Sequence, residues 1–215
     1  MALKTNGELR KQARKALEGN WDMALCFTFI TYVIVGMPAV LFCNSEIALY
    51  SNNAVWTLVC LPLLYSFCIS FLDLVRGKRN KIGFLFDGYR NFVNIFFPML
   101  LRVGYTFLWS LLFIVPGIIK SLSYAMTPFV MHDHPEMRYD EPINESMRLM
   151  QGKKMKLFML YLSFIGWGIL CLLTFGIGFI FLAPYVHASE AAFYEDLVAE
   201  DKGYGEEYVP FNETV

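Results

Sequence analysis

The stretch "WSLLFIVPGIIKSLSYAM", Trp109 to Met126, decides how this chain is built. It belongs to an apolar run from Phe92 to Met131 that would be about 60 Å long as a single helix, at 1.5 Å per residue. A hydrocarbon core is roughly 30 Å thick, so the run is too long for one membrane crossing. Pro116 and Gly117 stand near its middle. Because proline lacks an amide donor and glycine accepts strained angles, we expect the chain to turn there.

Charge is scarce in this sequence and unevenly distributed. Only 17% of the 215 residues are charged and 56% are hydrophobic, whereas soluble domains carry about 25% charged residues. Long uncharged runs separate a few charged clusters, which is typical of an all-α, polytopic membrane protein. The formal net charge of −1 gives no general attraction to nucleic acid, so we expect no nucleic-acid partner.

We predict one integral membrane domain at 1–197, a transmembrane bundle of about six helices in three hairpins. The predicted spans are 21–43, 55–75, 92–115, 118–132, 157–173 and 177–195. The last apolar run is about 45 Å long as a helix, too long for one upright crossing and short for two. Gly176 and Gly178 mark its expected turn. The alternative is five helices, with a tilted last helix and the C-terminus outside.

Lysine and arginine are concentrated on one predicted side of the membrane. The basic clusters lie at 4–15, 76–90 and 138–156, whereas 44–54 contains no lysine or arginine. The positive-inside rule then places both chain ends in the cytoplasm. We expect the acidic segment 198–215 to be a flexible tail.

The segment 1–20 has the pattern of a basic amphipathic helix. Its apolar face carries Leu9, Ala13, Ala16 and Leu17, and its basic face carries Arg10, Lys11, Arg14 and Lys15. Such a helix suits the interface of a bilayer with anionic inner-leaflet lipids. The segment 141–158 has a similar pattern. The alternative for both is an ordinary charged loop that flanks a span.

Three glycines occupy comparable places before predicted spans. Gly19, Gly88 and Gly152 each follow an acidic or amide residue and precede an apolar run. This pattern favours three copies of a unit made of an interfacial helix and a membrane hairpin, and internal repeats are common in membrane proteins. The alternative is that any helix about to enter a bilayer has this appearance.

Arg102 is the most informative charge in the apolar runs. It lies well inside the third predicted span, where a charge is costly and normally faces protein or water. Asp73 and Glu190 are its candidate partners. The alternative is that the span begins near Arg102 and the side chain lies at the interface.

Other candidate chemistry is weak. His132, Asp133 and His134 group closely, but their spacing matches no recognised helical ligand pair, and a solvated loop ending before Pro135 is the favoured interpretation. The five cysteines lie in or beside apolar runs and are expected to be buried thiols. With no recognised catalytic or phosphate-binding motif, we assign no catalytic, metal or cofactor residues and expect no cofactor.

Five segments together resemble a known family. They are "ELRKQARKALEGNW", "FIVPGIIKSLSYAM", "NESMRLMQGKKMKLF", "LSFIGWGILCLLTFGIG" and "APYVHASEAAFYEDL". In this order they are similar to the bacterial integral-membrane family catalogued as domain of unknown function 975, from about Glu8 to Leu197. The resemblance implies a bacterial cytoplasmic-membrane protein and brings no assigned activity or site residues.

Three functions fit the sequence. A membrane scaffold or interaction protein, with a protein partner or as a homo-oligomer, is favoured because the spans show few polar residues. A small transporter or permease subunit is the alternative and would use Arg102 and the discontinuous helices at Pro116 and Gly176. A lipid-modifying membrane enzyme using His132 to His134 is the third.

Overall fold

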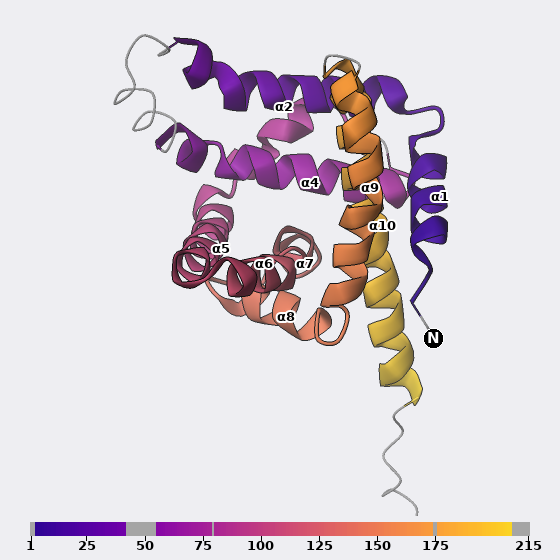
Figure 1. Ribbon diagram of the computed structural model, residues 1–215. Coiled ribbons are helices and arrows are strands. Elements are labelled where there is room, and N and C mark those ends of the chain that lie inside the picture. The colour runs from indigo at the N-terminus through magenta and orange to yellow at the C-terminus, as the bar shows by residue number, and fades with distance from the viewer. Residues whose placement is uncertain (1–2, 42–54, 79, 174–175, 208–215) are drawn as a thin grey trace, which may run out of the picture.

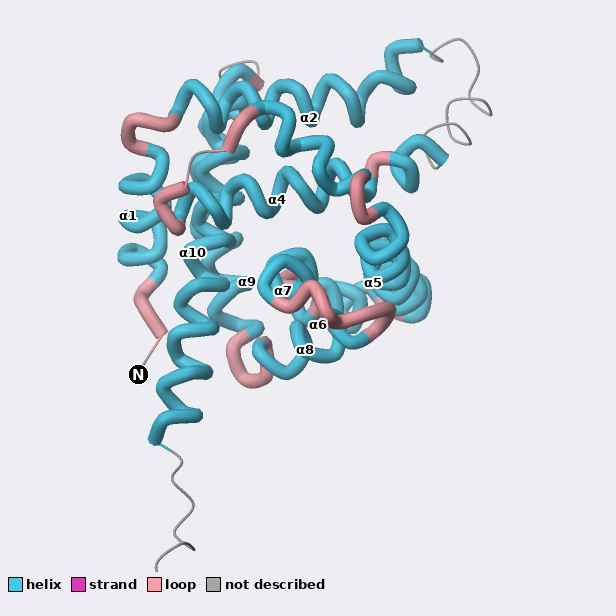
Figure 2. The backbone as a smooth tube through the Cα atoms, turned by 180° about the vertical axis from the view of Figure 1, so that it is seen from behind, coloured by secondary structure: helices cyan, strands magenta, loops and turns pink. Residues whose placement is uncertain are grey.

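The computed structural model describes residues 3–41, 55–78, 80–173 and 176–207, and every regular element in these residues is a helix (Figures 1 and 2). The elements are α1 (Asn6–Leu17), α2 (Trp21–Leu41), α4 (Leu61–Val75), the 3-10 helix η1 (Ile82–Tyr89), α5 (Phe92–Leu112), α6 (Ile114–Ser123), α7 (Thr127–Asp133), α8 (Glu141–Leu149), α9 (Lys154–Leu173) and α10 (Ile177–Glu207). The predicted all-α fold is confirmed for this part of the chain. The expected loop at 44–54 lies outside the described residues.

Two of the three repeat glycines lie in the turn that follows a helix, Gly19 after α1 and Gly152 after α8. Gly19 and Gly152 have φ angles of +76° and +70°, the left-handed backbone that stops a helix and that glycine adopts without strain. Gly88 differs, because it lies within η1 and its amide donates to Ser66 Oγ at 2.9 Å. A Cβ at Gly88 would collide with the Pro62 carbonyl oxygen. The predicted repeat therefore has its glycines in two different roles.

The turn of the second hairpin lies slightly before the predicted position. α5 ends at Leu112, Phe113 has extended backbone, and α6 starts at Ile114. Pro116 thus sits in the first turn of α6, where its missing amide donor costs nothing. Gly117 allows α6 to approach α5, since a Cβ there would lie 2.8 Å from Ser110 Cα. Pro116 therefore lies in the first turn of the returning helix and Gly117 packs that helix against α5. The chain itself reverses at Phe113.

The third hairpin uses two glycines in its turn. Gly176 has a φ of +84°, and its amide donates to the Cys171 carbonyl at 3.0 Å. A Cβ at Gly178 would lie 2.6 Å from Cys171 Sγ. Gly178 and Cys171 are therefore paired across this hairpin at the same chain spacing as Gly117 and Ser110.

Each hairpin joins an outer helix to an inner one. Only 17% of Phe92–Leu112 in α5 is buried, whereas 61% of Ile114–Asp133 in α6 and α7 is buried. The outer helices α2 and α9 are similarly exposed, and α4 and residues 188–200 of α10 are largely buried. In Figure 1, α2 and α4 run horizontally, α9 and α10 run vertically, and α5 is seen nearly end-on. The three hairpins point in different directions and do not form a parallel bundle. They meet where Arg76 after α4, Asp133 in α7 and Glu195 in α10 lie together, and we call this region the base.

Four segments of the described chain are long and apolar enough to cross a membrane. They are Trp21–Pro38, Phe92–Leu112, Ile114–Asp133 and Lys154–Leu173. The helix α4 is apolar but has 15 residues, and α10 combines an apolar first half with an acidic second half. The count of six crossings therefore stays a prediction.

The C-terminal segment begins as helix and not as a flexible tail. α10 continues to Glu207. Lys153 Nζ lies 2.6 Å from Glu200 Oε2, and Arg148 reaches Asp201 at 2.7 Å. These ion pairs hold the helix beyond the predicted boundary at 198, because they tie its acids to α8 and to the loop before α9. Residues 208–215 lie outside the described part.

Candidate functional site

Arg76 joins all three hairpins at the base of the molecule. It follows α4, and its two terminal nitrogens donate to Asp133 at the end of α7, at 2.7 and 2.6 Å. Its Nε donates to Glu195 of α10 at 2.7 Å, and Tyr194 Oη donates to Asp133 at 2.9 Å. The hydrogen bonds to Asp133 raise the pKa of Arg76 above its ordinary value. We call these four residues the polar junction, and its satisfied charges indicate a structural role.

The polar junction accounts for much of the histidine and aspartate grouping noted in the sequence. Asp133 is engaged by Arg76, and His134 Nδ1 lies 3.1 Å from Glu136 Oε1. His132 Nε2 lies 3.9 Å from Asp73 Oδ1. Within the described ranges, no three histidine, cysteine or acidic side chains cluster as metal ligands would. The residues of this grouping therefore face three separate partners.

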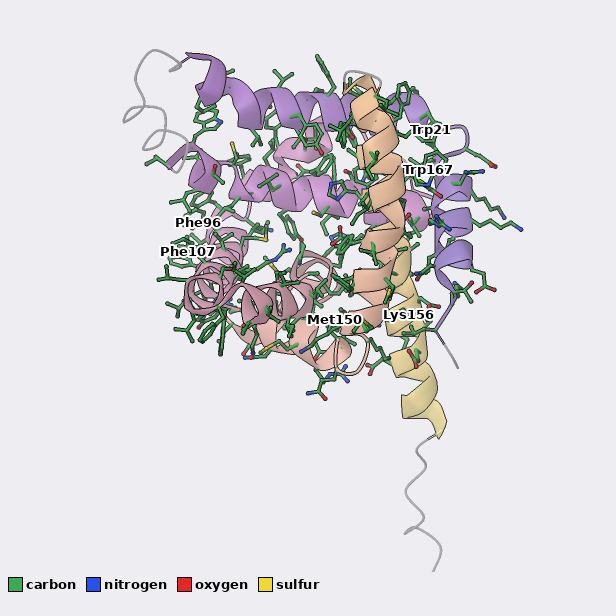
Figure 3. The ribbon with its side chains drawn as sticks, viewed as in Figure 1. Trp21, Phe96, Phe107, Met150, Lys156 and Trp167 are labelled. Atoms are coloured by element: carbon green, nitrogen blue, oxygen red, sulfur yellow. The ribbon has the colours of Figure 1, made fainter. Side chains whose placement is uncertain are left out.

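Arg102 lines a cavity of about 550 Å³ between α2, α4, α5, α6 and α10. Its wall is mostly apolar, with Phe67 from α4, Met99 from α5 and Phe107, which Figure 3 labels on α5. Among the residues that the structure describes, no ion pair or hydrogen bond engages the Arg102 guanidinium. The cavity thus contains a cationic group without a direct partner.

A second polar group lies behind the cavity on α9 and α10. Tyr161 Oη donates to Glu190 Oε1 at 2.9 Å, and His187 Nδ1 lies 3.5 Å from Glu190 Oε2. The His187 ring lines the cavity and packs edge-on against Phe67 at 4.9 Å. Arg102 lies within electrostatic range of Glu190. Arg102 and Glu190 therefore attract each other electrostatically but form no direct ion pair.

The two partners that the sequence suggested for Arg102 have different positions. Asp73 is wrong as a partner: it lies at the base, where Asn80 Nδ2 donates to its Oδ2 at 2.7 Å and Lys78 lies 3.6 Å from its Oδ1. Glu190 lies on the Arg102 side. The end of α4 carries Asp73 away from the cavity, because the helix runs from the cavity wall to the polar junction.

Sequence reasoning missed several polar groups of the cavity. Thr31 is fully buried on α2, and its hydroxyl has no hydrogen-bond partner among the described residues. Tyr161 and His187 reach the site from helices far from α5 in the sequence. Their only sequence signal was a polar side chain at an inner position of an apolar run. An unpaired cation in a mostly apolar cavity suits a ligand with an anionic end and an apolar body.

The fold defines a class: an all-helical protein with four segments suited to membrane crossing by length and composition. Residues 113–201 match the family model described as "Protein of unknown function (DUF975)". This match confirms the resemblance over that part of the chain, which contains four of the five similar segments, from "FIVPGIIKSLSYAM" to "APYVHASEAAFYEDL". The segment Glu8–Trp21 lies outside it. No curated protein and no solved structure matches the chain.

Proposed function

We propose that this chain is an integral membrane protein that binds an amphiphilic anion in the Arg102 cavity, as a small transporter or permease subunit would. The observation that carries the proposal is the guanidinium of Arg102, which faces a mostly apolar cavity and is engaged by no described side chain. A charge in such a place is costly and usually marks a ligand or ion pathway.

The size of the cavity agrees with this class of ligand. Small-molecule sites commonly have volumes of about 300–1,000 Å³, and this cavity measures about 550 Å³. The apolar wall would hold a hydrocarbon body, and Arg102 would hold a carboxylate or phosphate. Glu190 balances Arg102 at longer range when the cavity lacks an anion, and its Tyr161 hydrogen bond holds it in place.

A scaffold role is the second candidate, and one observation favours it. The three hairpins diverge from the base, so apolar faces of α5 and α9 are open to other membrane helices (Figure 1). A scaffold would bind a protein partner on these faces, and Arg102 would be unnecessary for that binding.

The basic clusters support a cytoplasmic base with both chain ends on one side. Residues from each cluster pair with the acidic second half of α10, including Lys4 with Asp196 at 3.8 Å and Arg76 with Glu195 at 2.7 Å. The positive-inside rule then favours three complete hairpins in a cytoplasmic membrane. A reporter fused to the C-terminus and active only outside the cytoplasm should stay inactive.

The test compares Arg102→Gln with Lys120→Gln. Lys120 is a matched control because it also lies in a membrane-type segment, but its Nζ faces the Trp109 ring at 5.1 Å and does not line the cavity. Each protein is purified gently, and its bound molecules are identified by mass spectrometry. We expect an anionic amphiphile with the wild type and with Lys120→Gln, and at least about a tenfold loss with Arg102→Gln, since a charged contact contributes about 1.5–3 kcal/mol.

Two outcomes would contradict this assignment. If Arg102→Gln retained the same amphiphile at wild-type occupancy, the cavity would not be its site. If a stoichiometric protein partner were retained by all three proteins and no amphiphile by any of them, the scaffold role would replace the proposal.

A further inference from the structure

The helix α1 packs into the protein and leaves its basic face free. Its apolar residues Leu9, Ala13 and Leu17 are completely buried, in contact with α10, α4 and α9. Figures 1 and 2 both show α1 alongside α10. The apolar face expected to enter lipid is thus used by the core. The outward basic face of α1 is therefore free to bind a ligand.

A groove runs from this basic face onto α9 and α10. One part has a volume of about 280 Å³ and is lined by Gly7, Arg10, Lys11, Arg14, Trp167 and Tyr185. A second part, also of about 280 Å³, shares Arg14, Trp167 and Tyr185 and continues to Cys171 and Leu182. Figure 3 shows Trp21 and Trp167 beside the end of α1, and both line the second part. The two parts form one groove, with a cationic end and an apolar end.

The cations of this groove differ from those at the base. Arg76, Arg148 and Lys153 are each satisfied by acidic side chains. Within the described part of the chain, the side chains of Arg10, Lys11 and Arg14 have no acidic partner. Three unpaired cations close together on one helix favour an anion from outside the chain.

We propose that this groove binds one anionic phospholipid, with its phosphate on Arg10, Lys11 and Arg14 and an acyl chain along α9 and α10. The charge of the head group complements the cationic end. The apolar half, which extends to Cys171 and Leu182, has no use for a soluble anion and fits a hydrocarbon chain. Trp167 is 48% exposed between the two halves, and its amphipathic ring suits the boundary between head group and chain. This site is separate from the Arg102 cavity, so each stands without the other.

The experiment measures lipid binding to the intact purified protein in detergent by native mass spectrometry. Dioleoyl phosphatidylglycerol and dioleoyl phosphatidylcholine are titrated separately, and soluble glycerol phosphate is added as a competitor. We expect tighter binding of phosphatidylglycerol, by roughly fivefold for each basic contact. The combined variant Arg10→Gln, Lys11→Gln and Arg14→Gln should lose that preference and still bind phosphatidylcholine as the wild type does.

The matched control removes the same charge elsewhere. Lys15, Lys81 and Arg138 are all exposed and line neither part of the groove, so changing all three to Gln should keep the preference. The single variant Arg14→Gln tests the residue shared by both parts, should the triple variant fail to fold, and should reduce the preference roughly fivefold. Equal binding of the two lipids by the wild type, an equal loss in the control, or displacement of the lipid by glycerol phosphate would each overturn the proposal.

Discussion

The outer and inner helices of the hairpins differ in exposure and in how their polar side chains are paired. α5 is mostly exposed, and its residues Phe107 and Leu111 are 68% and 73% exposed. α4 is mostly buried, and Asp73 in its last turn and Arg76 just after it are paired within the protein. The outer helices expose apolar side chains without specific packing, as a helix that faces lipid would. The inner helices meet the requirement of the core, where each polar group needs a partner.

Helix length and acidic residues, more than burial, separate the helices that hydropathy identifies from those that it does not. The outer helices α2, α5 and α9 each contain a long apolar segment, and so does the inner segment Ile114–Asp133. The inner helix α4 is apolar but has only 15 residues, and α10 has an acidic second half. The inner helix α10 carries Glu190 and Glu195, which lower its mean hydropathy but are stabilised by partners from other parts of the chain. A buried helix whose acids are paired within the fold can therefore be less hydrophobic than its exposed neighbour.

The largest expected effect compares phenylalanines on the two kinds of helix. Phe71 on α4 is 1% exposed and packs edge-on against Phe67 at 5.1 Å. Phe71→Ala should lower the free energy of unfolding by about 3–5 kcal/mol, because it leaves a cavity in the core. Phe107→Ala on α5 removes an exposed ring and should cost less than about 1 kcal/mol. Unfolding in mixed micelles measures both, and equal losses would contradict the division into outer and inner helices.

A smaller effect concerns the contact between outer and inner helices. Gly117→Ala places a methyl group against the Ser110 backbone, so it should destabilise the protein by about 1–3 kcal/mol. Gly104 lies on α5, and a methyl group added there would touch nothing: no atom outside the adjoining helix backbone lies within 4 Å of it. Gly104→Ala should therefore be neutral or stabilising by up to about 1 kcal/mol. The same unfolding assay separates them, and a destabilising Gly104→Ala would show that helix contact is not the cause.

The position of each helix in the sequence was more predictable than the helices against which it packs. The exposed helices follow from apolar composition and the apolar face of α1, with Leu9, Ala13 and Leu17, follows from periodicity, because each property is local. The packing of that face into the core, instead of against lipid, does not follow from periodicity. The turn was placed at Pro116 because proline signals a break, but its position in the first turn of α6 depends on the packing of Gly117 against Ser110. Proline alone does not specify on which side of it the chain reverses.

The candidate sites depended on relations between distant segments. Arg102 was identified from the sequence because a charge is conspicuous in an apolar run. Its surroundings were not, since Thr31, Tyr161 and His187 come from three other helices. The polar junction was missed for the same reason: Arg76, Asp133 and Glu195 each look like an ordinary charge at a helix end, and only folding brings them within hydrogen-bonding distance.

The smallest expected effect is a pH dependence at the exposed end of an inner helix. Hydrogen bonding to Arg148 lowers the pKa of Asp201 on α10, and Glu145 and Lys153 are the other charged groups near it. A lowered folded-state pKa means that the pair stabilises the fold at neutral pH and loses this contribution as the pH falls from about 5 through the lowered pKa. Asp201 is 41% exposed, so the pair should contribute at most about 1 kcal/mol. Asp201→Asn should unfold more easily than the wild type at pH 7, and the difference should shrink by pH 4. A difference that stayed constant over this range would mean that packing of α10, and not the charge of Asp201, holds this end of the helix.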